Sequence, residues 1–301
     1  MTRVILTGAS GFIAQHTLAP LLARGYEIHA PVRQIPAQSI PGVVWHQVDL
    51  LDPMAVTNLM VQVRPHSLLH MAWYVAHGHY WRAPENLAWV QASLHLIQQF
   101  WAAGGQRVVC AGTCAEYDWR HGYCVEQVTP TVPQLLYGTA KHALQTLLSV
   151  YATQQQLSFA WGRIFFLYGP HEPPARFVAS IIQALLNGQP APCSHGHQVR
   201  DLLYVHDVAD AFVTLLASDV QGPVNIGSGQ PISLGEVAEQ IGQMIGRPDL
   251  IQLGARPTPL DDPPFLVASV QRLHHEVGWQ PSYRLHQGVE ATIAWWRSRE
   301  R

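Results

Sequence analysis

Charged side chains are scarce in this sequence, and none of them gather into a block of one sign. Asp, Glu, Lys and Arg make up 13% of the 301 residues, and the formal net charge at pH 7 is −2. The chain therefore offers no basic surface for nucleic acid or an anionic membrane, and we expect neither as a partner. Hydrophobic residues reach 48%, which excludes disorder and indicates a well-buried globular core.

Other features are missing as well. No apolar run reaches the ~18 residues that a membrane-spanning helix requires. The four cysteines form no CxxC pair, and the seventeen histidines show neither HExxH nor CxxC…H spacing. A strand-like run over residues 4–6 starts almost at Met1, so we expect no signal peptide. These absences predict a cytoplasmic protein without a metal site.

The first segment has the order strand, glycine-rich turn, helix. An apolar strand over residues 3–7 leads into a turn over residues 8–14, and a helical pattern follows to Leu22. Gly8 permits the tight turn, Gly11 lets the backbone approach a pyrophosphate, and the small Ala14 allows close helix–strand packing. The phosphates of a dinucleotide would then lie at the helix N-terminus. A plain turn between strand and helix is the alternative.

The end of the second strand bears on the choice of cofactor. Enzymes that prefer NAD usually place an Asp or Glu there to bind the ribose 2′-hydroxyl. After the strand at residues 27–30, this chain has Pro31, Val32 and Arg33. An arginine would pair with a 2′-phosphate, so the sequence predicts NADP(H), with NAD(H) as the alternative. Arg33 could equally be a solvated loop residue.

Two further strand ends carry candidate cofactor contacts. Asp49 and Leu50 follow the strand at residues 43–48, where the acid can accept from an adenine amino group or cap the next helix. Met71 and Ala72 end the strand at residues 67–72, and the small Ala72 would let the cofactor pass. The aromatic loop of residues 73–81, which begins with Trp73, is either a substrate wall or a packed loop.

The stretch of residues 136–142 carries the candidate acid/base pair. In a helix, Tyr137 and Lys141 lie one turn apart on the same face. An ammonium beside a phenol favours the phenolate, so we expect Lys141 to lower the tyrosine pKa from its usual value near ~10. Thr113 stands at the end of the strand at residues 107–111. Taken alone, the pair could be a chance surface pair.

Strands and helices alternate along the first half of the chain. This order predicts an α/β fold, a Rossmann-like doubly wound parallel sheet with right-handed crossovers. From Pro170 to Gly196 the pattern loosens, which predicts a smaller C-terminal substrate-binding lobe. We expect a dinucleotide-binding domain at residues 1–166, with returning segments near 200–225, and an interwoven lobe at residues 167–301.

Together, these motifs occur in the order found in a known superfamily. They are Thr7-Gly8-x-x-Gly11-Phe12-Ile13, Asp49-Leu50, His70-x-Ala72, Thr113 with Tyr117, Tyr137-x-x-x-Lys141, Arg163 with Tyr168-Gly169-Pro170, Arg200-Asp201 before Tyr204–Val208, Asn225–Gly229 and Gly278-Trp279-x-Pro281. The chain resembles the extended short-chain dehydrogenases/reductases, the NAD-dependent epimerase/dehydratase family, which acts mostly on nucleotide sugars.

The resemblance implies a role for each matching residue. Tyr137 would exchange a proton with the substrate oxygen, Thr113 would hydrogen-bond that oxygen, and Lys141 would hold the nicotinamide ribose. The residues implied in cofactor binding are Gly8, Ser10, Gly11, Phe12, Ile13, Arg33, Asp49, Leu50, Met71, Ala72, Tyr137 and Lys141. Those implied in substrate binding are Trp73, Thr113, Cys114, Phe166, His171, Arg200 and Arg256, with the two arginines on the diphosphate.

The chain departs from the family pattern at three positions. Dehydratases of the family place Asp-Glu after the Thr, whereas Cys114 and Ala115 stand here, so 4,6-dehydration is not expected. Phe166 replaces an Asn that often binds the sugar or its diphosphate. His171 follows Tyr168-Gly169-Pro170, as in epimerising GDP-fucose synthases, but Cys114 is shifted by one position from their partner cysteine. His171 is therefore either an epimerisation acid/base or a loop histidine.

These observations predict an NADP(H)-dependent oxidoreductase acting on a nucleotide sugar, most simply a reductase of a 4-keto-6-deoxyhexose. The alternatives are an epimerase with bound NAD, a reductase of a non-sugar carbonyl, and a non-catalytic dinucleotide sensor. The helix at about residues 84–103 carries Trp89, Leu94 and Trp101, more apolar surface than one core stripe requires. Since this helix and the Tyr137 helix commonly pair across a dimer in the family, we expect a homodimer.

Overall fold

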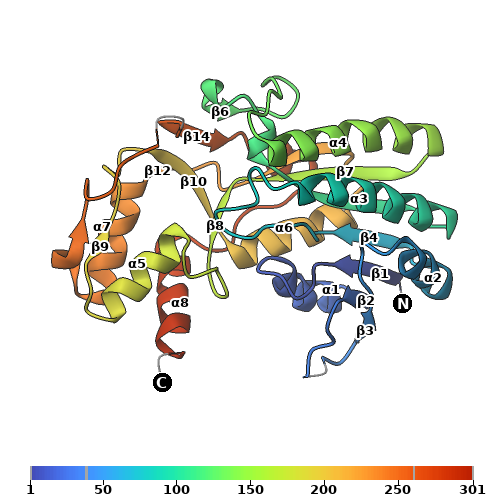
Figure 1. The fold of residues 1–301 in the computed structure, drawn as a ribbon, viewed down its shortest axis with the longest axis horizontal. Helices are drawn as coiled ribbons and strands as arrows, with labels where there is room; N and C mark the ends of the chain where they lie inside the picture. Colours follow the sequence, from blue (N-terminus) through green and yellow to red (C-terminus); the bar gives the residue numbers. More distant parts are fainter. Residues whose placement is uncertain (1, 38–39, 260–261, 300–301) are drawn as a thin grey trace.

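A parallel sheet forms the centre of the computed structural model, which describes residues 2–37, 40–259 and 262–299 (Figure 1). Its strand order is β11-β7-β5-β4-β1-β2-β3, and every neighbouring pair is parallel. The strands are β1 (Thr2–Thr7), β2 (Tyr26–Val32), β3 (Val43–Gln47), β4 (Ser67–His70), β5 (Arg107–Thr113), β7 (Ser158–Ile164) and β11 (Gly222–Ile226). The predicted doubly wound, Rossmann-like sheet is confirmed.

Helices cover both faces of this sheet. One layer contains α2 (Pro53–Val63), α3 (Glu85–Ala102) and α4 (Leu136–Gln155), and the other contains η1 (Ala14–Thr17), α1 (Leu18–Ala23) and α6 (Val205–Ala217). Side chains alternate along β1, so Val4 and Leu6 join one apolar core while Ile5 joins the other. Both faces are therefore buried, as the near-continuous apolar strands require.

A second, smaller sheet lies in the C-terminal part of the molecule. It has the order β12-β10-β14-β6, with β8 paired to β10. Its strands are β6 (Tyr123–Cys124), β8 (Phe166–Tyr168), β10 (Val199–Tyr204), β12 (Pro231–Ser233) and β14 (Phe265–Ala268). Beside it, at the left of Figure 1, lie α5 (Phe177–Leu186), α7 (Leu234–Ile245), α8 (Leu285–Arg297) and the short pair β9 (Ala191–Pro192) and β13 (Ile251–Gln252). Because β6 pairs here and β11 returns to the large sheet, the chain crosses between the two sheets repeatedly.

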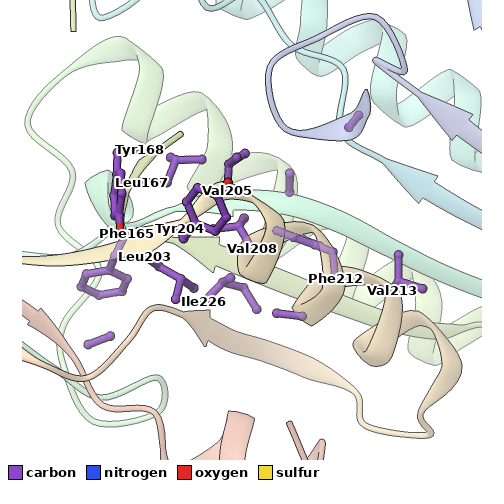
Figure 2. Close-up of a cluster of buried hydrophobic side chains, with 14 of the residues drawn as sticks. Phe165, Leu167, Tyr168, Leu203, Tyr204, Val205, Val208, Phe212, Val213 and Ile226 are labelled. Carbon is purple, nitrogen blue, oxygen red and sulfur yellow. The ribbon is translucent and has the colours of Figure 1, made fainter. Parts of the chain in front are cut away.

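One apolar core continues across the junction of the two sheets. Figure 2 shows α6 contributing Val208 and Phe212 beside Phe165 and Leu203. Phe212 is fully buried, and a Cβ on Gly162 would lie 2.5 Å from its ring, so the phenyl group fills the space that the glycine leaves. This packing holds α6 against the face of the large sheet.

Candidate active site

The carboxyl ends of β1 and β4 are joined by one hydroxyl group. The Thr7 Oγ1 accepts hydrogen bonds from the amides of Met71, at 3.0 Å, and Ala72, at 3.1 Å, and lies 2.8 Å from Nδ1 of His70. Burial lowers the pKa of His70 to about 3, so the ring is neutral. Its Nδ1 accepts a hydrogen bond from the Thr7 hydroxyl, which itself accepts from the two amides. The other ring nitrogen faces the Ser93 hydroxyl at 2.9 Å.

The glycine-rich turn fits against this edge and leaves its backbone open. Gly8 has φ 75°, and a Cβ there would lie 3.0 Å from the Ala72 nitrogen. A Cβ on Gly11 would lie 3.0 Å from the Gly8 oxygen, while Ser10 and Gly11 are exposed. Only glycine fits these positions without strain, and the free amides beyond them suit a pyrophosphate. The first turn after them is the 3₁₀ segment η1 rather than an α-helix.

The residues proposed to reach the adenosine end lie at the next strand ends. Arg33 directly follows β2 and is exposed. Asp49 is exposed, and its Oδ1 accepts from the amide of Leu51 at 3.0 Å. The side chain that caps α2 is Asp52, which accepts from the amides of Met54 and Ala55. The capping alternative for Asp49 is therefore wrong.

The first turns of α4 bring the candidate acid/base residues to the end of β5. The Thr113 hydroxyl lies close enough to the Tyr137 phenol to lower its pKa, against the larger effect of burial. Lys141 is the only lysine in the 301 residues. Its Nζ donates to the carbonyl of Ala111 at 2.7 Å and lies 3.8 Å from the centre of the Trp73 ring. Thr113, Tyr137 and Lys141 thus lie together, as their sequence positions predicted.

The charge states of the pair differ from the expectation. The pKa of Tyr137 is raised, chiefly by burial and then by the neighbouring Tyr80, while the bond from Thr113 lowers it. Burial also lowers the pKa of Lys141 to about 7, so its ammonium is half lost at neutral pH. The predicted lowering of the tyrosine pKa by Lys141 is not found here. In this structure Tyr137 is a protonated phenol, ready to donate.

An aromatic loop covers the pair. The Tyr80 ring meets the Tyr137 ring edge to face, with centroids 4.8 Å apart, and the Trp81 ring does the same at 5.7 Å. The Tyr137 amide donates to the Trp81 carbonyl at 3.1 Å. Trp73 is only 9% exposed and faces Lys141. Of the predicted loop, Tyr80 and Trp81 line the approach to the phenol, whereas Trp73 packs behind it.

A buried carboxylate holds the end of β5 in place. Glu116 is fully buried and accepts from the Thr113 amide at 2.8 Å, the Trp161 indole at 2.9 Å and Nε of Arg163 at 2.7 Å. A Cβ on Gly112 would lie 2.0 Å from the Trp161 indole nitrogen, so the glycine makes room for this contact. Sequence reasoning missed Glu116, although an acid so close to an apolar strand was a usable signal.

The sequence matches a described family over most of its length. The profile of the "NAD dependent epimerase/dehydratase family" matches residues 4–227. This chain belongs to that family. The predicted resemblance is confirmed, and the protein is an enzyme of the short-chain dehydrogenase/reductase type.

Named relatives of this family member catalyse different reactions. The UDP-glucuronic acid decarboxylase 1 of Xenopus tropicalis is 26% identical, over 98% of this chain and 72% of the relative. The CDP-abequose synthase of Salmonella typhimurium is 26% identical, over 96% and 97%. Among solved structures, the UDP-glucose 4-epimerase of Thermus thermophilus in complex with NAD is 27% identical, with TM-score 0.85, over 98% of this chain and 99% of that one.

The remaining predicted substrate residues lie in three places. Cys114 is buried next to Thr113, and burial raises its thiol pKa. Arg200 is 3% exposed, is paired with Asp262 at 2.5 Å and lies over Phe166. Two other predicted residues lie apart from these. Arg256 is exposed, and the His171 ring packs on Trp295 of α8, with ring centroids 4.7 Å apart.

One cation near the turn was not predicted. The Arg176 guanidinium lies 5.9 Å from the Phe12 ring, beside the glycine-rich turn, and pairs with Glu172 at 3.7 Å. Glu172 is buried, which raises its pKa to about 7. Burial raises the pKa of the Tyr80 phenol, and the nearby guanidinium of Arg176 lowers it. Its place between the turn and the aromatic loop makes it a further candidate for binding an anionic group.

Two absences apply to the part of the chain that the structure describes. No group of three or more His, Cys, Asp or Glu side chains is placed there to hold a metal ion. Within those same ranges, no helix is both long and apolar enough to cross a membrane.

Dinucleotide affinity is expected to depend on the charge of Lys141. Below pH 7 this side chain is an ammonium that can hold a ribose hydroxyl; above pH 7 it becomes a neutral amine, because burial lowers its pKa to about 7. We expect the affinity for NADPH or NADH to fall roughly tenfold between pH 6 and 9. Isothermal titration calorimetry measures this. A Lys141→Met variant should give a flat curve, and an equally steep curve in that variant would contradict the assignment.

Proposed function

We propose that this enzyme reduces the keto group of a 4-keto-6-deoxyhexose carried on a nucleoside diphosphate, with NADPH as the reductant. The observation that carries the proposal is that Thr113, Tyr137 and Lys141 lie together at the carboxyl end of β5, where the Tyr137 phenol is protonated at neutral pH. Reduction of a ketone needs a proton donor at the oxygen, whereas oxidation of a hydroxyl needs a base there. A tyrosine that is protonated at neutral pH is in the state that the first task requires.

The proposed mechanism assigns one task to each residue of the pair. The bound nicotinamide supplies the hydride that adds to the carbonyl carbon. The Thr113 hydroxyl donates a hydrogen bond to the carbonyl oxygen and stabilises the charge that develops on it. Tyr137 gives its proton to the same oxygen, which completes the secondary alcohol. Lys141 orients the ribose.

The same geometry disfavours elimination of water. The position after Thr113 is the Cys114 thiol, whose pKa is raised by burial, and Ala115 has no acid or base at all. Glu116 is bound to Arg163 at 2.7 Å and to the Thr113 amide, so its carboxylate is not free to move a proton. This leaves hydride transfer as the chemistry that the residues support.

An epimerase is the second candidate, because a related solved structure is a UDP-glucose 4-epimerase that holds NAD. The same Thr113, Tyr137 and Lys141 would oxidise and then reduce one carbon, with the cofactor retained. That cycle begins with Tyr137 as a base, for which its raised pKa is unfavourable. His171, at the lobe junction beside Trp295, is not placed by any contact to assist it.

The substrate anion has two candidate sites. Arg176 lies between the glycine-rich turn and the aromatic loop and is one-third exposed, so it can meet a diphosphate directly. Arg200 is buried and already paired with Asp262, so a diphosphate would have to replace that carboxylate. Phe166, under the Arg200 guanidinium, offers an apolar surface where the family pattern has an amide.

A Tyr137→Phe variant should lose its turnover and keep its cofactor. We expect kcat for reduction to fall by roughly 10²–10⁴, because the proton donor is removed, with NADPH affinity unchanged. NADPH oxidation with a panel of 4-keto-6-deoxyhexose nucleotides measures the first quantity and calorimetry the second. The control is Tyr151→Phe, lower on the same helix, which should keep full activity. NAD that stays bound to the purified wild type until denaturation would count against the reductase.

Arg33 should set the preference between the two dinucleotides. We expect Arg33→Asp to weaken NADPH binding by roughly tenfold or more, because the carboxylate repels the 2′-phosphate, and to leave NADH binding unchanged or stronger. Calorimetric titrations with NADPH and with NADH measure both affinities for the variant and for the wild type. A wild type that binds NADH as well as NADPH would remove Arg33 from this role.

We also propose a homodimer formed through α3 and α4, which run side by side (Figure 1). Their outward apolar side chains are Leu87, Trp101, Leu147 and Val150. A Leu147→Asp, Val150→Asp double variant should halve the mass measured by light scattering, since two charges would enter the apolar contact. The control is Val61→Asp, at an exposed position of α2, which should leave the mass unchanged. A wild-type mass equal to that of one chain would overturn the proposal.

A further inference from the structure

A single buried amide ties together the aromatic side chains around the pair. Asn86, at the start of α3, is fully buried. Its Oδ1 accepts from the Trp73 indole at 2.8 Å, and its Nδ2 donates to the carbonyls of Tyr80, at 2.7 Å, and Ala83, at 2.8 Å. An amide side chain offers one accepting oxygen and two N–H donors, and here both ends are used.

The groups that Asn86 holds are the ones that contact the catalytic pair. The Trp73 ring lies 3.8 Å from Nζ of Lys141, within the range of a cation–π contact. The backbone at Tyr80 sets the position of the ring that meets Tyr137. Asn86 bonds to Trp73, Tyr80 and Ala83 and not to Lys141 or Tyr137, so any effect it has on that pair passes through the aromatic loop.

We propose that Asn86 and Trp73 are positioning residues for Lys141: the amide fixes the indole, and the indole face stabilises the ammonium form. The proposal deepens the function proposed above and rests on the role given there to Lys141. It does not depend on which substrate the enzyme reduces.

The other titratable groups that face Lys141 are either uncharged or already paired, so the indole can influence the protonation of Lys141. They come from three elements besides its own helix. On β4, His70 is neutral, since burial lowers its pKa to about 3. On β5, burial raises the pKa of the Cys110 thiol to about 12, so it too is uncharged at neutral pH. Glu116 carries a charge but shares it with Arg163 in an ion pair.

The contact between the Trp73 ring and the Lys141 ammonium therefore opposes the effect of burial, which lowers the pKa of Lys141. Burial lowers the pKa of Lys141, and the Trp73 face and the Ala111 carbonyl favour its protonated form. Without the Trp73 indole, the ammonium would keep the hydrogen bond to Ala111 and the more distant Trp161 ring, whose centre is 5.8 Å away. Trp73 would then decide how much of Lys141 remains charged at the pH where the enzyme works.

Because Lys141 is the only lysine, its titration can be observed directly. Lysine labelled with ¹³C at Cε gives one side-chain resonance in the full-length, cofactor-free protein. We expect the wild-type resonance to titrate near pH 7. Trp73→Leu should move the midpoint to lower pH by about 0.5 to 1 pH unit, and Asn86→Leu should move it in the same direction by less. Trp45→Leu, a control on β3 in a different apolar cluster, should leave the midpoint unchanged.

The outcomes separate this proposal from its alternatives. An unchanged midpoint in Trp73→Leu, or a midpoint that rises because water enters the slot, would overturn it. If Trp73→Leu does not fold, Trp73→Phe keeps a ring over Lys141 but loses the bond to Asn86, and a lowered midpoint is again required. The pH at which dinucleotide affinity is half lost should shift with the midpoint. A protein without reductase activity would still give the titration, so the two proposals fail independently.

Discussion

The buried ion pair between Glu116 and Arg163 is the contact on which the site depends most. It fixes the amide of Thr113 and joins β5 to β7. The Arg163 guanidinium also donates to the Tyr117 hydroxyl at 3.0 Å. This hydroxyl in turn donates to Asn225 on β11 at 2.7 Å. Removing one partner of such a pair leaves a buried charge and typically costs ~3–5 kcal/mol. The position of Thr113 is therefore set by charges outside the proposed catalytic pair.

The features that the sequence predicted correctly are those with a local pattern. Gly8 and Gly11 follow a strand, and Tyr137 and Lys141 are separated by one helical turn, so short spacing was enough to place them. The alternation of strands and helices predicted a parallel, doubly wound sheet for the same reason. The short strands of the smaller sheet pair over long distances in the chain, and no local period marks them.

The rest of the site arises from contacts between distant residues. Trp73 meets Lys141, and Glu116 meets Arg163, only because β4, β5 and β7 lie side by side. The sign of the tyrosine pKa shift also depended on such a contact. The spacing of Tyr137 and Lys141 predicted a lowered pKa, but the loop that carries Tyr80 buries the phenol and raises it.

The single lysine has a consequence for the molecule as a whole. Of its eighteen lysine and arginine side chains, seventeen are guanidinium groups, which ordinarily stay protonated well above neutral pH. The one side-chain ammonium lies inside the fold, with a pKa of about 7. Raising the pH above 7 therefore deprotonates the buried Lys141 ammonium before the guanidinium groups lose their charge. Reagents that acylate lysine side chains have a single target in this protein, and it lies beside the proposed proton donor.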